Sequence, residues 1–315
     1  MKQGVVLDWD CIGPDISQKR LADLPIHWTF YGNSRSDQLE ERLKGMEIAV
    51  AGKVSLKKET LSRSKTLKLI AEMATGTDNI DVAAAKELGI AVCNVPAYST
   101  DSVAQLVLLF ILSLLGSAQS YQNTKKEWPQ SPLFTLFNGP IHEAKNKTVG
   151  IMGAGQIGQE VGRLCRPFGM KTIFMASRDP KRSQPGALPL EQILPIADFI
   201  TLHLPLTAET KHLFNEKHIF AMKKGAFLIN TARGGLIEEK ALAKALKEGH
   251  LSGAALDVLS QEPPPKDHLL LDPALTNLLI TPHIGWASIE ARERLAACLL
   301  ENIRDFLNGQ PKNLV

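Results

Sequence analysis

The chain has 315 residues, of which 44% are hydrophobic and 22% are charged, and its formal net charge is +3. This length is sufficient for about two domains, and the composition is that of an ordinary globular protein. The small, dispersed positive charge argues against a nucleic-acid-binding surface. The longest apolar run, Leu106 to Leu115, is too short to span a bilayer. We therefore expect neither a nucleic acid nor a membrane as a partner.

The N-terminus and the cysteines indicate the compartment. The pattern of Gly4–Asp8 predicts a strand rather than the apolar region of a signal peptide. The four cysteines, Cys11, Cys93, Cys165 and Cys298, are far apart, which is typical of a reduced cytosolic protein with buried thiols. No cluster of Cys and His has the spacing of a zinc site. We expect a cytoplasmic protein without a metal.

Residues 4 to 95 alternate between strand and helix patterns. The expected strands are Val5–Asp8, Ile48–Ala51, Lys68–Met73 and Ile90–Cys93. The expected helices include Ser36–Lys44 and Asp81–Leu88, and a long apolar helix over residues 100–118 follows. Strands that alternate with helices predict a parallel sheet with helices on its faces.

A glycine-rich segment, Gly153-Ala154-Gly155-Gln156-Ile157-Gly158, follows the apolar strand Thr148–Met152 and begins an amphipathic helix. In this context the three glycines allow a tight turn, close approach of the backbone to a pyrophosphate, and close packing of helix on strand. The pyrophosphate would lie at the helix N-terminus, where unpaired N–H groups and the helix dipole favour an anion. The segment therefore predicts a bound dinucleotide.

The residues after the next strand indicate which dinucleotide is bound. An Asp or Glu about 20 residues beyond the glycines usually holds the ribose 2′-hydroxyl of NAD, and an Arg nearby accommodates the 2′-phosphate of NADP. Here the chain reads Ala176-Ser177-Arg178. A hydroxyl and a guanidinium would attract a phosphate that a carboxylate would repel. We expect NADP(H) to be preferred, with NAD(H) as the second choice.

The remaining strands and the last helix suggest the domain organisation. Further strands are expected near Thr172–Met175, Phe199–Leu202, Ala226–Ile229, Gly253–Leu256 and Leu278–Thr281. We hypothesise that the final helix, Ser288–Leu307, returns to the first domain. The predicted fold is α/β, with two doubly wound parallel-sheet domains: a discontinuous substrate-binding domain, 1–99 and 287–315, and a dinucleotide-binding domain, 100–286. The active site is expected in a cleft between them, at the carboxyl ends of the strands.

Three charged residues follow strand patterns in the second domain. Arg233 lies in Asn230-Thr231-Ala232-Arg233-Gly234-Gly235 and could grip a carboxylate with two hydrogen bonds, although a surface Arg is an equal alternative. Glu262 precedes three prolines and, taken alone, would be a solvated loop carboxylate. His283 follows an apolar strand, and His is the usual general acid or base near neutral pH, although a core His is the alternative.

Together these segments resemble the D-isomer-specific 2-hydroxyacid dehydrogenase family across nearly the whole chain. The resemblance rests on the glycine segment, on Leu228–Leu236 with Arg233, on Ala254–Glu262 and on Pro282–Gly285. It implies a flavodoxin-like substrate domain, a Rossmann domain, a homodimer, and catalytic roles for Arg233, Glu262 and His283. Within the family the chain is most similar to bacterial glycerate dehydrogenases, or hydroxypyruvate reductases, on the residues Ala74–Asp81, Val92–Pro96, Ser102–Gln105 and Ile284–Ser288.

The expected site residues fall into two overlapping sets. The expected cofactor-binding residues are Gly153, Gly155, Gln156, Ile157, Gly158, Ser177, Arg178, His203, Pro205, Thr210, Thr231, Ala232, Arg233, Asp257, His283 and Gly285. The expected substrate-binding residues are Thr75, Gly76, Thr77, Arg233 and His283. Tyr98, Trp128 and Trp286 are candidates for the substrate pocket, but large aromatic residues more often belong to a core or an interface.

The expected reaction is NADPH-dependent reduction of a small 2-oxo acid, hydroxypyruvate or glyoxylate, to D-glycerate or glycolate. His283 would act as the general acid, Glu262 would orient it, and Arg233 would bind the substrate carboxylate. One alternative is another substrate of the same family, either phosphoglycerate or a bulkier 2-oxo acid. The other is a dinucleotide-sensing or corepressor-type binding protein, because a fold does not determine a function.

Overall fold

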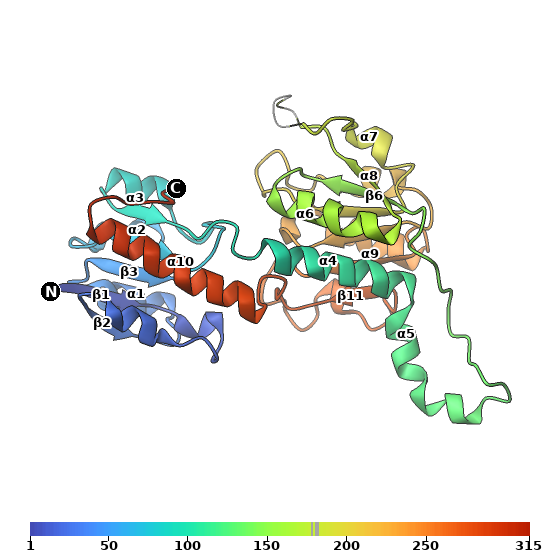
Figure 1. Cartoon of the computed structure of the whole chain (residues 1–315), viewed down its shortest axis with the longest axis horizontal. Helices are drawn as coiled ribbons and strands as arrows, with labels where there is room; N and C mark the ends of the chain where they lie inside the picture. The colour runs from blue at the N-terminus through green and yellow to red at the C-terminus, as the bar shows by residue number, and fades with distance from the viewer. Residues whose placement is uncertain (178, 180–182) are drawn as a thin grey trace. The chain divides into compact units, whose positions relative to one another are not determined.

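The computed structural model describes residues 1–177, 179 and 183–315, so Arg178 lies outside the described residues. The chain divides into two compact units (Figure 1). The first consists of Met1–Ser99 together with Ala287–Val315, and the second consists of Thr100–Trp286.

The first unit is built on a five-stranded sheet in which all neighbouring strands are parallel. Its strands are β1 (Lys2–Val6), β2 (Ile26–Phe30), β3 (Ile48–Ala51), β4 (Leu69–Glu72) and β5 (Ala91–Cys93). The spatial order β2-β1-β3-β4-β5 is that of flavodoxin-like folds. The direction of winding reverses between β1 and β3, where such sheets open a crevice beyond their carboxyl ends.

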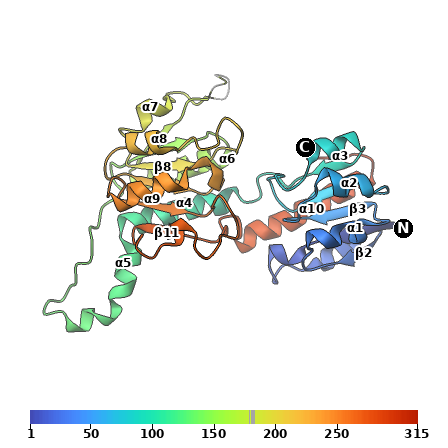
Figure 2. The ribbon, with the colours of Figure 1, turned by 180° about the vertical axis from the view of Figure 1, so that it is seen from behind.

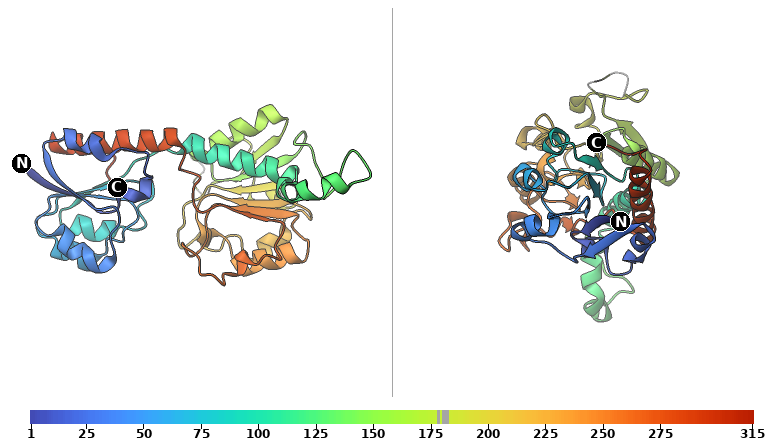
Figure 3. Two further views of the ribbon diagram at one scale, coloured as in Figure 1. Left: turned by 90° about the horizontal axis from the view of Figure 1, so that it is seen from below. Right: turned by 90° about the vertical axis from the view of Figure 1, so that its left-hand side faces the viewer.

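Helices cover both faces of this first sheet (Figure 3). One face packs with the short helices α1 (Leu39–Leu43), α2 (Lys58–Arg63) and α3 (Val82–Glu87) through buried residues such as Leu43, Leu61 and Ala85. On the other face α10 (Ile289–Leu307) contacts β4. Ser288 caps this helix by accepting the N–H of Ala291. The last helix of the chain thus belongs to the same unit as the first strands.

The sheet that the structure describes in the second unit has six parallel strands. They are β6 (Thr148–Met152), β7 (Lys171–Phe174), β8 (Phe199–Leu202), β9 (Phe227–Asn230), β10 (Gly253–Leu256) and β11 (Leu278–Ile280). Their spatial order is β11-β10-β9-β8-β6-β7. A single parallel bridge between Met175 and Leu188 extends the sheet beyond β7. The winding reverses between β6 and β8, which is where a dinucleotide binds in such sheets.

Two apolar layers sandwich this second sheet. One layer contains α4 (Thr100–Leu115) and α6 (Gln156–Cys165), packed through residues such as Phe110 and Val161. The opposite layer contains α7 (Leu190–Ile193), α8 (Glu216–Ala221) and α9 (Glu239–Lys247), and α8 and α9 are seen over the sheet in Figure 2. Because both faces are covered, the strands are apolar along most of their length.

The predicted fold class is confirmed by these two sheets and their helix layers. One strand, β2, was not predicted. Only Ile26 in it is buried, and the other four residues are half-buried or exposed. An edge strand with so little burial carries no strong apolar pattern.

An arm extends from the end of α4 in the second unit (Figure 1). It consists of residues 117–143 and contains α5 (Ala118–Gln122) and the turns Asn123–Lys126 and Trp128–Gln130. No single helix among the described residues has the length and apolarity needed to cross a membrane. Among the same described residues, α4 and Ala118–Lys126 match by length and composition when taken together across a 70° bend.

Candidate active site

The glycine segment forms the turn between β6 and α6. Gly153 has a φ of 113° and packs directly against the carbonyl oxygen of His203, so a Cβ at this position would collide with backbone. Gly158 packs in the same way against the carbonyl oxygen of Gly153. These contacts bring the start of α6 against the ends of β6 and β8. The first and third glycines are therefore required by the packing of the protein itself.

Gly155, the second glycine, is different because no neighbouring atom excludes a side chain at this position. A Cβ built there meets nothing within 4 Å. It is the N-cap residue of the ten-residue helix α6 and makes no side-chain cap. The space beside a helix N-terminus is suited to an anion, and a glycine that leaves it open fits a pyrophosphate. The described residues thus fit a dinucleotide at this turn.

A second feature at the same sheet edge also fits a bound group. Thr231, directly after β9, has a buried hydroxyl oxygen with no hydrogen-bond partner among the described residues. An unsatisfied buried hydroxyl is unfavourable, and a ligand with a polar group would satisfy it. Asn230 is fully buried and shapes this turn, because its Oδ1 accepts the N–H of Ala232 and its Nδ2 donates to the carbonyl oxygen of Arg233. Sequence reasoning did not identify Asn230 as a site residue.

Ser177 lies three residues beyond the end of β7. Its N–H donates to Oγ of Ser183 at 2.8 Å, and its own Oγ accepts the N–H of Asp179 at 3.2 Å. Ser177 is therefore hydrogen-bonded to both Ser183 and Asp179. Because the Ser177 oxygen acts as an acceptor here, its hydroxyl proton can still be donated to an acceptor such as a phosphate.

His203 follows β8, and its side chain is neutral. Burial lowers the pKa of His203 to about 3, and its Nε2 lies 3.0 Å from Oγ1 of Thr201. It therefore brings no positive charge to the end of β8. Beyond it, Thr210 closes a turn by donating from Oγ1 to the carbonyl oxygen of Pro205 at 2.6 Å.

Arg233 and Glu262 lie on two loops that are packed together. Gly234 sits directly against the backbone of Leu259, which leaves no room for a side chain. Nη1 of Arg233 donates to the carbonyl oxygen of Ala232 at 2.8 Å. Oε1 of Glu262 accepts the N–H of Leu259 at 3.0 Å. The close packing of Gly234 thus joins the loop that carries Arg233 to the loop that carries Glu262.

Glu262 and His283 form the closest polar pair in this group. Nδ1 of His283 lies 2.6 Å from Oε2 of Glu262. Their side chains are 36% and 30% exposed, so the pair is accessible from solvent. Since a carboxylate only accepts hydrogen bonds, Nδ1 carries the proton in this arrangement. Nε2 of His283 is then the ring nitrogen that can exchange a proton with another molecule.

Asp257 holds the backbone that presents His283. Its carboxylate is 2% exposed and accepts hydrogen bonds from the Thr281 hydroxyl at 2.6 Å and from the N–H groups of Ile284 and Gly285 at 2.9 and 2.8 Å. Burial raises the pKa of Asp257, while these donors act in the opposite direction. His283 itself has a φ of 55°, which is uncommon for a residue with a side chain. The buried carboxylate therefore stabilises a strained turn.

The expected substrate-binding segment, Thr75 to Thr77, lies in the first unit after β4. Oγ1 of Thr75 donates to the carbonyl oxygen of Val95 at 2.7 Å, and Nδ2 of Asn94 donates to the carbonyl oxygen of Thr75 at 2.7 Å. In the described part of the chain, the N–H groups of Gly76 and Thr77 have no protein acceptor. Successive unpaired N–H groups form an anion-binding arrangement.

The aromatic candidates lie in different environments. Tyr98 is 7% exposed in the first unit, and Trp128 is 59% exposed on the arm. Nε1 of Trp286 donates to the carbonyl oxygen of His283 at 2.9 Å, so this ring supports the His283 turn.

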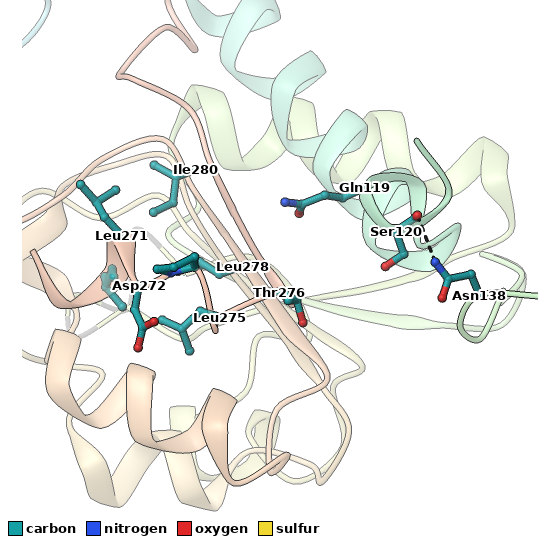
Figure 4. Close-up of a pocket in the computed structure, with 11 residues that line it drawn as sticks. Gln119, Ser120, Asn138, Leu271, Asp272, Leu275, Thr276, Leu278 and Ile280 are labelled. Carbon is teal, nitrogen blue, oxygen red and sulfur yellow. Dashed lines mark hydrogen bonds between the residues drawn. The ribbon is translucent and has the colours of Figure 1, made fainter. Parts of the chain in front are cut away.

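A cavity of about 650 Å³ lies elsewhere in the second unit (Figure 4). It is lined by Gln119, Ser120 and Asn138 of the arm and by residues between Leu270 and Ile280. None of the expected site residues lines it. We therefore do not assign the substrate to this cavity.

Comparison with known proteins agrees with this geometry. Residues 108–285 match the family model described as D-isomer specific 2-hydroxyacid dehydrogenase, NAD binding domain. The chain is 41% identical over 281 residues to a glycerate dehydrogenase of Methylorubrum extorquens, covering 89% of this chain and 88% of the relative. It is 34% identical over 319 residues to a hydroxypyruvate reductase of Blautia hydrogenotrophica, covering 99% and 98%.

A solved structure, an acyclic imino acid reductase in complex with NADPH and D-Arg, superposes with a TM-score of 0.89 at 29% identity and full coverage of both chains. The family match, the identities and the dinucleotide turn agree, and the chain belongs to the D-isomer specific 2-hydroxyacid dehydrogenase family of nicotinamide-dinucleotide-dependent oxidoreductases.

Proposed function

We propose that the chain reduces a small 2-oxo acid, hydroxypyruvate or glyoxylate, to D-glycerate or glycolate, with NADPH as the preferred hydride donor. The observation that carries this proposal is the 2.6 Å contact between Nδ1 of His283 and Oε2 of Glu262. It leaves Nε2 of an oriented imidazole to deliver a proton. The relatives named glycerate dehydrogenase and hydroxypyruvate reductase support this choice of substrate.

The protein has two tasks in this reaction: to bind the charged carboxylate of the substrate and to transfer a proton. A nicotinamide dinucleotide, when bound, supplies a hydride to the carbonyl carbon. His283 donates its Nε2 proton to the carbonyl oxygen as negative charge develops there, and then recovers a proton from solvent. Glu262 holds the ring and stabilises its protonated form. Arg233 binds the substrate carboxylate and favours the developing charge electrostatically.

The N–H groups near Thr75, Gly76 and Thr77 would bind the substrate carboxylate as well. Among the described residues the N–H groups of Gly76 and Thr77 have no protein acceptor, which supports this role. The cofactor-binding roles proposed for Gly153, Gly155 and Gly158 rest on the turn described above. Those of Thr231, Asp257 and Gly285 rest on their position after β9, β10 and β11, at the carboxyl edge of the sheet.

The preference for NADPH rests on the end of β7. The chain presents Ser177 there, with Arg178 next to it, where a carboxylate would favour NAD. Arg178→Ala should reduce kcat/KM for NADPH much more than for NADH. Arg166→Ala, an exposed arginine of the same unit, is the matched control. A wild-type enzyme that prefers NADH would overturn this assignment.

The partner of the chain is proposed to be a second copy. Five large apolar residues are exposed on the arm: Trp128, Leu133, Phe134, Phe137 and Ile141, with Phe134 93% exposed. Monomeric proteins rarely leave such a group in water. Sedimentation of the wild type and of a Phe134→Ser, Phe137→Ser double variant tests this. A monomeric wild type at micromolar concentration would overturn the proposal.

The test of the reaction is oxidation of NADPH and of NADH at 340 nm with hydroxypyruvate, glyoxylate and pyruvate in parallel. Fast NADPH-dependent turnover of hydroxypyruvate is the expected result. No turnover with any 2-oxo acid, alongside measurable NADPH binding, would favour a dinucleotide-sensing binding protein.

A further inference from the structure

A cluster of acidic side chains lies at the carboxyl edge of the first sheet. Asp8 follows β1, the segment Gly52–Val54 follows β3, and Glu72 is the last residue of β4. The winding of the sheet reverses between β1 and β3, so this edge is where flavodoxin-like sheets bind ligands. The reaction proposed above uses none of these side chains.

Asp8 is a buried acidic residue that is hydrogen-bonded to the loop after β3. Its side chain belongs to a residue only 3% exposed, and its oxygens accept the N–H groups of Gly52, Lys53 and Val54 at 2.9, 2.5 and 3.1 Å. Burial raises the pKa of Asp8, while these three N–H donors act in the opposite direction. The three hydrogen bonds fix the loop after β3.

Asn79 connects that loop to the loop after β4. Its Nδ2 donates to the carbonyl oxygen of Val54 at 3.0 Å and to Oε1 of Glu72 at 3.3 Å. The backbone of Leu56 pairs with the same region, since its N–H donates to the carbonyl oxygen of Asn79 and its own carbonyl oxygen accepts the N–H of Asp81, both at 2.9 Å. The two loops are thus held at a fixed spacing.

Glu72 is fully buried beneath both loops. Its Oε2 has no hydrogen-bond partner among the described residues. Burial, with the Asp8 carboxylate as the second cause, raises the pKa of Glu72 to about 9. A carboxyl group in this position is neutral at pH 7, because a second negative charge beside Asp8 would be neither solvated nor paired.

The other titratable groups around Glu72 do not offset the effect of burial and of Asp8 on its pKa. Cys11 lies against Gly52, and burial raises the pKa of its thiol, so it adds no charge. Lys53 is exposed and lowers the pKa of Glu72 only as the last of four causes. Cys93 on β5 is also a neutral buried thiol, and α10 contacts β4 with a buried face of Ala291, Leu295, Ala296, Leu299, Asn302 and Ile303.

The loop that begins two residues after Glu72 carries the N–H groups of Gly76 and Thr77, which have no acceptor in the part of the chain that the structure describes. Asn94 and Val95 are hydrogen-bonded to Thr75 of this loop. Asn79 connects the same loop to Glu72 and, by way of Val54, to Asp8. Ionisation of Glu72 would therefore act on the spacing of the N–H groups that are proposed to bind the substrate carboxylate.

We propose that Glu72 is a positioning residue which acts as a neutral carboxylic acid, and that with Asp8 it sets the geometry of the carboxylate-binding loop at Thr75–Thr77. The inference rests on the proposed function, because the loop is assigned to the substrate there. Glu72 touches no substrate and takes no part in hydride or proton transfer.

The experiment compares KM and kcat for hydroxypyruvate in the wild type, Glu72→Gln and Glu72→Ala. Gln is uncharged and nearly isosteric, so it should preserve KM at pH 7, whereas Ala should raise KM on the order of 10-fold, the effect of losing about one hydrogen bond. The Kd for NADPH should stay the same in all three. Glu59→Gln, on the exposed surface of α2, is the matched control.

The decisive readout is the ratio of the wild-type KM to the Glu72→Gln KM between about pH 7 and pH 10. Any pH dependence that the two proteins share cancels in this ratio. The ratio should rise near pH 9, where Glu72 ionises and Gln cannot. A flat ratio in an active enzyme, or an increase of KM in Glu72→Gln at pH 7 as large as in Glu72→Ala, would overturn the inference alone.

A wild type that turns over none of the 2-oxo acids would overturn the proposed function, and this inference with it, because the loop would have no substrate carboxylate to bind. The two failures are therefore distinguishable from wild-type turnover alone.

Discussion

Glu262 binds two donors at once, His283 through Oε2 at 2.6 Å and the N–H of Leu259 through Oε1 at 3.0 Å. The carboxylate is thus anchored to its own loop while it orients a ring 21 residues further along the chain. The hydrogen bond from Leu259 restricts the carboxylate, and the restricted carboxylate fixes the tautomer and the orientation of the imidazole. This pair is the basis of the first two predictions.

Replacement of His283 by Ala removes the proposed proton donor. Turnover of hydroxypyruvate should fall by ~10²–10⁴-fold, which is the usual contribution of a general acid. The Kd for NADPH, measured by fluorescence titration, should change little. Unchanged kcat in a folded variant would remove His283 from the mechanism.

Glu262→Gln keeps the shape of the side chain but removes its charge. The His283 ring then loses the charged acceptor that orients it, so kcat for hydroxypyruvate should fall while the Kd for NADPH changes little. Initial rates of NADPH oxidation and a fluorescence titration with NADPH measure the two quantities. The exposed Glu209→Gln is a suitable control. An unchanged kcat in Glu262→Gln would contradict the pairing.

Two glycines of the same turn should respond in opposite ways to alanine. In Gly158→Ala the new Cβ would overlap the carbonyl oxygen of Gly153, so we expect about 1–3 kcal/mol lower stability, as for an overpacked core. Gly155→Ala meets no neighbour and should leave stability unchanged, yet weaken NADPH binding because the Cβ fills the anion space. Thermal unfolding and NADPH titration of both variants separate the effects. Equal behaviour of the two would contradict the assignment.

The buried Glu72 makes the unfolding free energy depend on pH. Its pKa is raised from 4.5 to about 9 in the folded chain, so the folded state keeps a proton that the unfolded state releases. This contribution to stability is fully present below about pH 4.5 and is lost as the pH rises to about 9. Glu72→Gln should therefore gain stability relative to the wild type over this window in urea unfolding. A constant difference between the two proteins would show that Glu72 titrates normally.

Much of the dinucleotide-binding unit follows from local pattern. Three patterns are adjacent in the chain, and each supports the assignment of the others. They are the apolar run Thr148–Met152, the glycine segment, and the helical spacing of Ile157, Val161 and Leu164. Strand β2 was not predicted because an edge strand with a single buried residue has little apolar signal. The isolated bridge between Met175 and Leu188 is too short to show an apolar pattern.

The sequence by itself determined the family, the two parallel sheets and the residue types at the strand ends, because these depend on apolar periodicity and on short adjacent motifs. Only the tertiary structure decided which of these residues meet. Glu72 is close enough to feel the charge of Asp8, a residue 64 positions earlier in the chain, because β1, β3 and β4 are neighbours in the sheet and both residues lie at its carboxyl edge. Asp257 supports the His283 turn because β10 and β11 are paired. Burial and pairing across such distances set the charge states of these acids, and no local pattern encodes them.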